Sequence, residues 1–257
     1  MPMASSKILR YEKRDRTAYI TLNRPEVMNA IDIELGQAIA AAVKDAEKDD
    51  DILVLIIIGE GGKAFSAGAD LKEKSRRDVT ESTNSWQDAD ANCTKPIIAA
   101  IDGHCVGGGL ELALRCDIRV ATQKSTFGLP EPRRSMLAGY GLHNLSRMIP
   151  LGEALLIQLT GSPITAERAY QIGLIQKLVP DRAALLQQAD AIANDIVQCA
   201  PLAVQAIKRI VKTGRNVPPE YSLKLAEPIR KFIDSTEDRL EGSRSFVEKR
   251  APKWKMR

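Results

Sequence analysis

Short hydrophobic runs alternate with amphipathic segments over the first half of the chain. Residues 17–22 (TAYITL), 96–101 (PIIAAI) and 118–122 (IRVAT) have the composition of strands. Residues 52–58 (ILVLIII) are apolar at every position, which is typical of a strand buried on both faces of a parallel sheet. After Asp32, apolar residues recur every three or four positions, which predicts a helix with Asp32 as its N-cap. This alternation predicts an α/β fold.

The second half of the chain has a helical pattern. We expect helices over residues 152–161, 166–172 and roughly 182–211, and a charge-rich helical remainder to residue 257. Residues 72–92 are polar without a clear period, which predicts a mobile helix or loop. No repeat or low-complexity linker divides the chain. We therefore expect one integrated domain, with an α/β core and the site over residues 1–195 and a helical region over residues 196–257.

Composition narrows the class of protein. The chain has 257 residues, and its hydrophobic content of 44% is enough for a sizeable core. A net charge of +4 does not favour a nucleic-acid partner. The four cysteines have no metal-ligand or redox-motif spacing, so we expect reduced thiols, a cytoplasmic location and no metal. The longest apolar run is too short to span a membrane, and the first residues do not resemble a signal peptide.

Two glycine-bearing turns follow apolar strands and each opens a helix. One turn is Ser66–Asp70 (SAGAD), and the other is Gly107–Gly109. Backbone N–H groups at a helix start carry a partial positive charge, and glycine lets a ligand approach them closely. Two such turns could direct two donors at one oxygen, as in an oxyanion hole. The alternative from the pattern alone is that both are tight turns with packing roles.

Two glutamates are candidates for proton transfer. Glu111 is flanked by leucines in a helix that should be buried, and Glu131 stands between two prolines after a strand. Two carboxylates beside an oxyanion hole would suit proton transfer at a carbon activated by a carbonyl group. Structural ion pairs of Glu111 with Arg115, or of Glu131 with Arg133 or Arg134, are an equal alternative on these residues alone.

Five motifs together resemble the crotonase (enoyl-CoA hydratase/isomerase) superfamily. They are LNRPEVMNAI, KAFSAGADLKE, KPIIAAIDGHCVGGGLELALRCD, FGLPEPRR and EGSRSFVEKRAPKW, in the superfamily's order and spacing. Each motif is moderately specific, whereas the ordered set is strongly so, and it covers about residues 7–257. The resemblance implies an α/β crotonase (ClpP-like) fold, in which a spiral of ββα turns precedes a helical C-terminal trimerisation region.

The resemblance also implies the chemistry and the assembly. It implies an acyl-CoA thioester substrate, no separate cofactor because coenzyme A is part of the substrate, and a homotrimer or a dimer of trimers. The reaction implied is syn hydration of a 2-enoyl-CoA to a 3-hydroxyacyl-CoA. Isomerisation, hydrolysis or decarboxylation of an acyl-CoA is the first alternative, since the superfamily uses one frame for several reactions. A non-catalytic scaffold or RNA-binding member is the second.

Site roles are carried over by position. Ala67 and Gly108 are implied as oxyanion-hole donors, Glu111 as the residue that activates water, and Glu131 as the acid at the α-carbon. The residues implied to bind the substrate or its CoA group are Arg24, Lys63, Ala67, Gly68, Ala69, Asp70, Leu71, Gly107, Gly108 and Gly139. Residues 138–142 (AGYGL) depart from the small-residue run usual after the second glutamate, which leaves the acyl preference open.

Overall fold

A computed structural model describes residues 7–74 and 93–257, and most of the polar segment 72–92 lies outside them. One large sheet has the strand order β1-β2-β3-β5-β7-β10. Only β1 pairs in the antiparallel sense, with β2, and the other pairs are parallel. The strands of this sheet are β1 (Leu9–Arg14), β2 (Thr17–Leu22), β3 (Val54–Gly59), β5 (Ile97–Ile101), β7 (Ile118–Thr122) and β10 (Lys177–Val179).

A second, smaller sheet holds four short strands in the order β4-β6-β8-β9. These are β4 (Ala64–Ser66), β6 (His104–Val106), β8 (Thr126–Gly128) and β9 (Ile164–Thr165), of which the first three are parallel. The chain passes from β3 to β4, from β5 to β6 and from β7 to β8. A helix follows each passage: α2 (Leu71–Lys74), α3 (Gly108–Arg115) and the 3-10 helix η2 (Glu131–Arg134). The predicted spiral of ββα turns is therefore confirmed.

Helices cover both faces of the large sheet. Helix α1 (Ile33–Lys48) begins at the predicted N-cap Asp32, whose carboxylate accepts from the Leu35 N–H, and it buries Ile39 and Val43. Helix α7 (Arg182–Gln198) buries Leu185 against the opposite face. All six residues of β3 are buried between them, which explains the continuous apolar run there. Helices α4 (Tyr140–Met148), α5 (Leu151–Thr160) and α6 (Ala166–Gln171) complete the core region.

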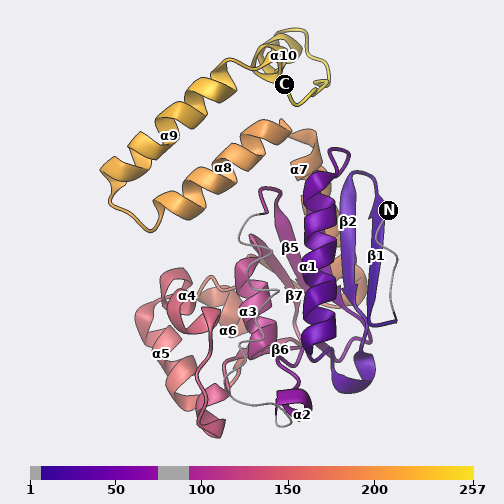
Figure 1. The fold of residues 1–257 in the computed structure, drawn as a ribbon, viewed down its shortest axis with the longest axis vertical. Helices are drawn as coiled ribbons and strands as arrows, with labels where there is room; N and C mark the ends of the chain where they lie inside the picture. Colours follow the sequence, from indigo (N-terminus) through magenta and orange to yellow (C-terminus); the bar gives the residue numbers. More distant parts are fainter. Residues whose placement is uncertain (1–6, 75–92) are drawn as a thin grey trace.

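The C-terminal helices extend away from the sheets (Figure 1). The helix expected over residues 182–211 is two helices, α7 and α8 (Pro201–Gly214). Pro201 starts α8 because its ring disfavours helical geometry in the preceding residue and it has no N–H to donate. Two further helices follow, α9 (Pro219–Asp234) and α10 (Glu237–Val247). The expected boundary after residue 195 lies inside α7, which packs on the large sheet, so the extended helical region begins with α8.

Candidate active site

The three parallel strands of the small sheet end side by side, and the predicted site residues follow them. The SAGAD turn follows β4, the glycine turn follows β6, and Glu131 comes after β8. The first two turns touch: a Cβ atom at Gly109 would lie 2.3 Å from the Ser66 carbonyl oxygen. A Cβ atom at Gly68, where φ is +90°, would lie 2.9 Å from the Gly108 nitrogen. Glycine at these positions therefore allows two backbone segments to approach each other.

The structure corrects the choice of Ala67 as an oxyanion donor. The Ala67 N–H donates to the Met28 carbonyl oxygen at 2.9 Å, so it is already engaged. The Gly68 N–H donates to Ser66 Oγ at 3.1 Å. The next residue, Ala69, has its nitrogen 3.3 Å from the position that a Cβ atom on Gly108 would take. The backbones of Ala69 and Gly108 thus lie next to each other across the two turns.

Glu111 lies in the first turn of α3 and is 6% exposed. Its Oε1 accepts a hydrogen bond of 2.7 Å from the Gly141 N–H, which belongs to the first turn of α4. The Arg115 guanidinium, one helical turn further, lies 4.1 Å from the centre of the Tyr140 ring. Burial of a carboxylate beside apolar side chains is costly unless hydrogen bonds satisfy it, and Gly141 supplies one.

Glu131 approaches the same glycine turn from another element. It begins η2, and its Oε1 lies 3.2 Å from the position of a Cβ atom on Gly107. The neighbouring Arg133 binds the end of α5, through the Thr160 carbonyl oxygen at 3.0 Å and Ser162 Oγ at 2.7 Å. The Glu131 carboxylate therefore borders the turn that carries Gly108, and Glu111 follows this turn in α3.

Arg24 and Lys63, both expected to contact the CoA group, lie in different environments. Arg24 binds Asp32 at 2.8 Å, Asp70 at 3.3 Å and the Ala30 carbonyl oxygen at 2.7 Å, so its guanidinium is committed to the protein. Lys63 lies at the opposite end of β4 from the site, where its carbonyl oxygen accepts from the His104 N–H. The structure does not bring Lys63 to the turn.

The remaining predicted residues stay near the two turns. Leu71 starts α2 directly after the SAGAD turn and is 42% exposed. Gly139 is the N-cap of α4, two residues before the donor to Glu111, and it is exposed.

The sequence analysis did not predict the role of Asn29, whose side chain hydrogen-bonds the backbone next to the SAGAD turn. Asn29 is fully buried, and its Oδ1 accepts from the Arg24 N–H at 2.9 Å. Its Nδ2 donates to the carbonyl oxygens of Glu60 at 3.0 Å and Ala64 at 2.8 Å. Met28 and Ile31 form backbone hydrogen bonds with the SAGAD turn. Residues 28–31 therefore hold this turn in place. The only available signal was the turn-forming Asn in the LNRPEVMNAI motif.

Two negative findings concern only the residues that the structure describes. No group of three or more His, Cys, Asp and Glu side chains there could hold a metal ion. None of the helices in this part of the chain is long and apolar enough to cross a membrane.

Comparison with known proteins shows the family of this chain. The profile described as "Enoyl-CoA hydratase/isomerase" matches residues 12–257. The chain belongs to the enoyl-CoA hydratase/isomerase family. It is 38% identical to the (E)-benzylidenesuccinyl-CoA hydratase of Thauera aromatica, over 94% of this chain and 96% of that protein. It is 33% identical to the short-chain-enoyl-CoA hydratase of Clostridium acetobutylicum, over 93% of this chain and 94% of that protein.

Solved structures of the family have the same fold. The crystal structure of an enoyl-CoA hydratase from Mycobacterium tuberculosis H37Rv superposes with a TM-score of 0.92 at 35% identity, covering 98% of this chain and all of that one. The enoyl-CoA hydratase from Bacillus anthracis gives 0.93 at 31% identity, over 97% of this chain and 100% of that one. The expected crotonase fold is therefore confirmed.

Proposed function

We propose that this protein is an enoyl-CoA hydratase, which adds water syn across the α,β double bond of a 2-enoyl-CoA and yields a 3-hydroxyacyl-CoA. The proposal is supported by two carboxylates on different elements near the glycine turn. Glu131 Oε1 lies 3.2 Å from the position of a Cβ atom on Gly107, and Glu111 follows the same turn in α3 and is bonded to Gly141. Names of relatives across the family support the same reaction class.

The N–H groups of Ala69 and Gly108 would bind the thioester carbonyl oxygen. Addition at the β-carbon moves the electrons of the double bond toward that oxygen, so the intermediate has enolate character. Preorganised donors stabilise the developing charge, and loss of one donor typically costs about 3 kcal/mol in the transition state. The substrate contributes its own coenzyme A, so the reaction balances without a separate cofactor.

The two glutamates would divide the proton transfers. Glu111, held by Gly141, would take a proton from water as the hydroxyl oxygen bonds to the β-carbon. Glu131 would give its proton to the α-carbon as the enolate collapses. One water is thereby added, and exchange with solvent removes the proton from Glu111 and returns one to Glu131.

The presence of two carboxylates favours hydration over the alternatives. Isomerisation moves one proton between carbons and needs a single base, whereas hydration must also hold a water molecule. Hydrolysis or decarboxylation on the same frame is the nearest alternative. The RNA-binding alternative has less support, because the net charge is only +4 and the candidate site is intact.

A spectroscopic assay tests the proposal. A series of 2-enoyl-CoAs of differing length and polarity should lose the absorbance of the conjugated thioester when mixed with the protein. In isotopically labelled water, the product should carry one solvent oxygen by mass spectrometry. A 3-enoyl-CoA should gain conjugation slowly or not at all. Rapid conversion of the 3-enoyl substrate, with the whole 2-enoyl series inert, would contradict the hydratase function.

We also propose a homotrimer or dimer of trimers in the cytoplasm, without nucleic acid or membrane as partner. Exposed apolar side chains on the C-terminal helices, such as Ile207 and Val211 at 61% each, support the assembly. The cytoplasmic location rests on the cysteine pattern of the sequence, which has no disulfide or metal-site spacing.

A further inference from the structure

The three corners at which the chain passes from the large sheet into the small one lie against each other. They are residues 59–63, 102–103 and 122–125. A Cβ atom at Gly103, where φ is +86°, would lie 2.1 Å from the Lys63 carbonyl oxygen, so the first two corners touch. The Gly103 N–H donates to Ser125 Oγ at 3.1 Å, which joins the second corner to the third.

One buried carboxylate lies where these corners meet. The Asp102 side chain is 1% exposed. Its Oδ1 accepts from Thr122 Oγ1 at 3.0 Å and lies 3.0 Å from Lys124 Nζ. Its Oδ2 lies 3.4 Å from Nη1 of Arg182, the first residue of α7. Asp102 thus binds the third corner directly, through a hydroxyl and a cation.

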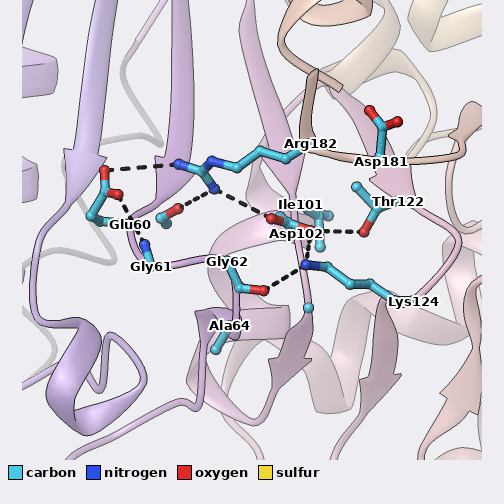
Figure 2. A network of polar contacts seen from close by, with 12 residues as sticks. Glu60, Gly61, Gly62, Ala64, Ile101, Asp102, Thr122, Lys124, Asp181 and Arg182 are labelled. Atoms are coloured by element: carbon cyan, nitrogen blue, oxygen red, sulfur yellow. Dashed lines mark hydrogen bonds and ion pairs between the residues drawn. The ribbon is translucent and has the colours of Figure 1, made fainter. Parts of the chain in front are cut away.

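The two cations also hold the first corner. Lys124 Nζ donates to the Gly62 carbonyl oxygen at 2.8 Å, and Arg182 Nη1 donates to the Gly59 carbonyl oxygen at 3.0 Å (Figure 2). Arg182 also lies 3.8 Å from the Glu60 carboxylate, which pairs in turn with Arg10. One carboxylate and two cations therefore connect all three corners.

The opposite ends of the same strands carry the candidate active site. Strands β4, β6 and β8 are three residues long, so the site lies on the order of 10 Å from the corners. The pairs His104↔Thr126 at the corner end and Val106↔Gly128 at the site end belong to one unbroken register. A displacement of the second or third corner would therefore be transmitted along β6 or β8 to the turn at its other end. The first corner is joined to them through the pairing of β4 with β6, whose register shifts between Ala64 and Ser66.

We propose that Asp102, together with Lys124 and Arg182, is a positioning cluster that sets the relative placement of the oxyanion donors at Ala69 and Gly108 and of Glu131. The inference rests on the oxyanion hole of the proposed function. None of the three residues touches the reacting atoms. They act by fixing the three strands from which those groups project.

The test is Asp102→Asn, with Asp117→Asn as the matched control. Asp117 is also a carboxylate between two cations, Lys208 at 2.8 Å and Lys212 at 2.7 Å, and it accepts the Ile97 N–H. It lies at the other end of the large sheet, where β5 and β7 begin. Both substitutions remove one charge from a paired site, and only the first touches the corners.

The direct readout is the ionisation of bound acetoacetyl-CoA, whose enolate absorbs in the near ultraviolet and requires both oxyanion donors. Removal of a negative charge roughly 10 Å away would by itself favour a bound anion. Displacement of the donors has the opposite effect. We expect Asp102→Asn to raise the apparent pKa of bound acetoacetyl-CoA by about one unit. Hydration kcat should fall about tenfold or more with KM changed less than about twofold, since small misplacements of reacting groups lower kcat.

Each outcome decides the inference. Asp117→Asn should leave both measurements unchanged even where it lowers the melting temperature. If Asp102→Asn keeps wild-type enolate formation and kcat while folded, or if Asp117→Asn loses as much, the positioning function is wrong. If Asp102→Asn does not fold, Lys124→Gln carries the test, because that lysine side chain is 56% exposed. If Lys124→Gln then keeps wild-type enolate formation and kcat, the inference is overturned. Failure of the wild-type protein to hydrate any 2-enoyl-CoA would instead refute the proposed function.

Discussion

The Gly141 N–H donates to Oε1 of Glu111 at 2.7 Å and so joins the first turn of α4 to the first turn of α3. The hydrogen bond holds a buried carboxylate in one orientation, as proton transfer at a defined position requires. Gly141 is itself buried, and a Cβ atom there would lie 3.0 Å from Leu129. A backbone donor and a close-packed glycine thus fix the side chain that we propose as the base.

We predict that Glu111→Gln and Glu131→Gln each lower hydration kcat by at least about 100-fold, because an amide cannot exchange the proton. Glutamine at 111 can still accept from Gly141, so the loss reports chemistry rather than a lost contact. Steady-state hydration and calorimetric binding of a saturated acyl-CoA measure the two effects, and binding should change little. Glu167→Gln, in the exposed first turn of α6, is the control. A variant that retains more than about a tenth of wild-type turnover would exclude that glutamate from acid–base work.

The Gly108→Ala variant tests the oxyanion hole. The added methyl group would lie 3.3 Å from the nitrogen of Ala69, the other proposed donor. We predict a loss of kcat on the order of 100-fold. Thermal stability should change little, because the higher helix propensity of alanine offsets the tight contact with the Ala69 backbone. Gly152→Ala is the control, since that glycine also lies in a first helical turn and no atom lies within 4 Å of its added methyl. Equal activity of the two variants would count against the assigned donors.

The sequence predicted elements well where the apolar pattern is long. The strands at Thr17–Leu22 and Ile118–Thr122 and the helix capped by Asp32 are confirmed. Of the small sheet, the residue pattern predicted only the strand before Glu131, because strands of three residues are too short to display an alternation. The first strand, β1, was missed because it is an edge strand with four charged or polar positions among six.

The candidate site was partly predictable. The glycine turns and both glutamates come together as expected. The error at Ala67 has a physical cause: which N–H of a turn is available depends on the Met28 carbonyl oxygen, 39 positions earlier, and no local pattern records that pairing. The anchoring of Glu111 by Gly141 is equally long-range.

The C-terminal tail, residues 248–257, should detach from the helices at low pH. Hydrogen bonds from the Arg250 guanidinium and the Lys253 N–H lower the pKa of Glu241 to about 2. A depressed carboxyl pKa stabilises the folded tail above the unfolded pKa of about 4.3, and the stabilisation is lost as pH falls toward 2. Trp254 reports the change, since its Nε1 donates to the Gln198 carbonyl oxygen at 2.8 Å.

The experiment follows Trp254 fluorescence in a Trp86→Phe background, which leaves it as the single tryptophan. We expect a transition between about pH 4.3 and pH 2 that is much reduced in Glu241→Gln. Circular dichroism recorded in parallel identifies the pH at which the helices themselves unfold. An identical fluorescence profile in both proteins would show that Glu241 does not hold the tail.

We predict a trimer or hexamer in solution. Exposed apolar side chains gather on α8 to α10, and Phe246 is 85% and Val247 79% exposed in a single chain. Monomeric proteins rarely expose such surface. Sedimentation of the wild-type protein should give a trimer or hexamer, and Phe246→Asp should shift it to smaller species because a charge would be buried at the contact. Only monomer at micromolar concentration in the wild-type protein would reject the assembly.

The function of Arg24 can be decided by comparing substrates with and without phosphate groups. Its guanidinium binds Asp70, at the end of the SAGAD turn, and Asp32, at the start of α1. We therefore expect Arg24 to order the turn rather than to bind a CoA phosphate.

Arg24→Met should lower kcat/KM about tenfold or more, because both carboxylates lose their partner in a largely buried site. The loss should be the same for an enoyl-CoA and for the enoyl thioester of N-acetylcysteamine, which has no phosphate. Asp70→Asn should show the same pattern, because it removes the other half of that contact. A defect in Arg24→Met that is large with CoA and absent with N-acetylcysteamine would instead identify Arg24 as a phosphate ligand.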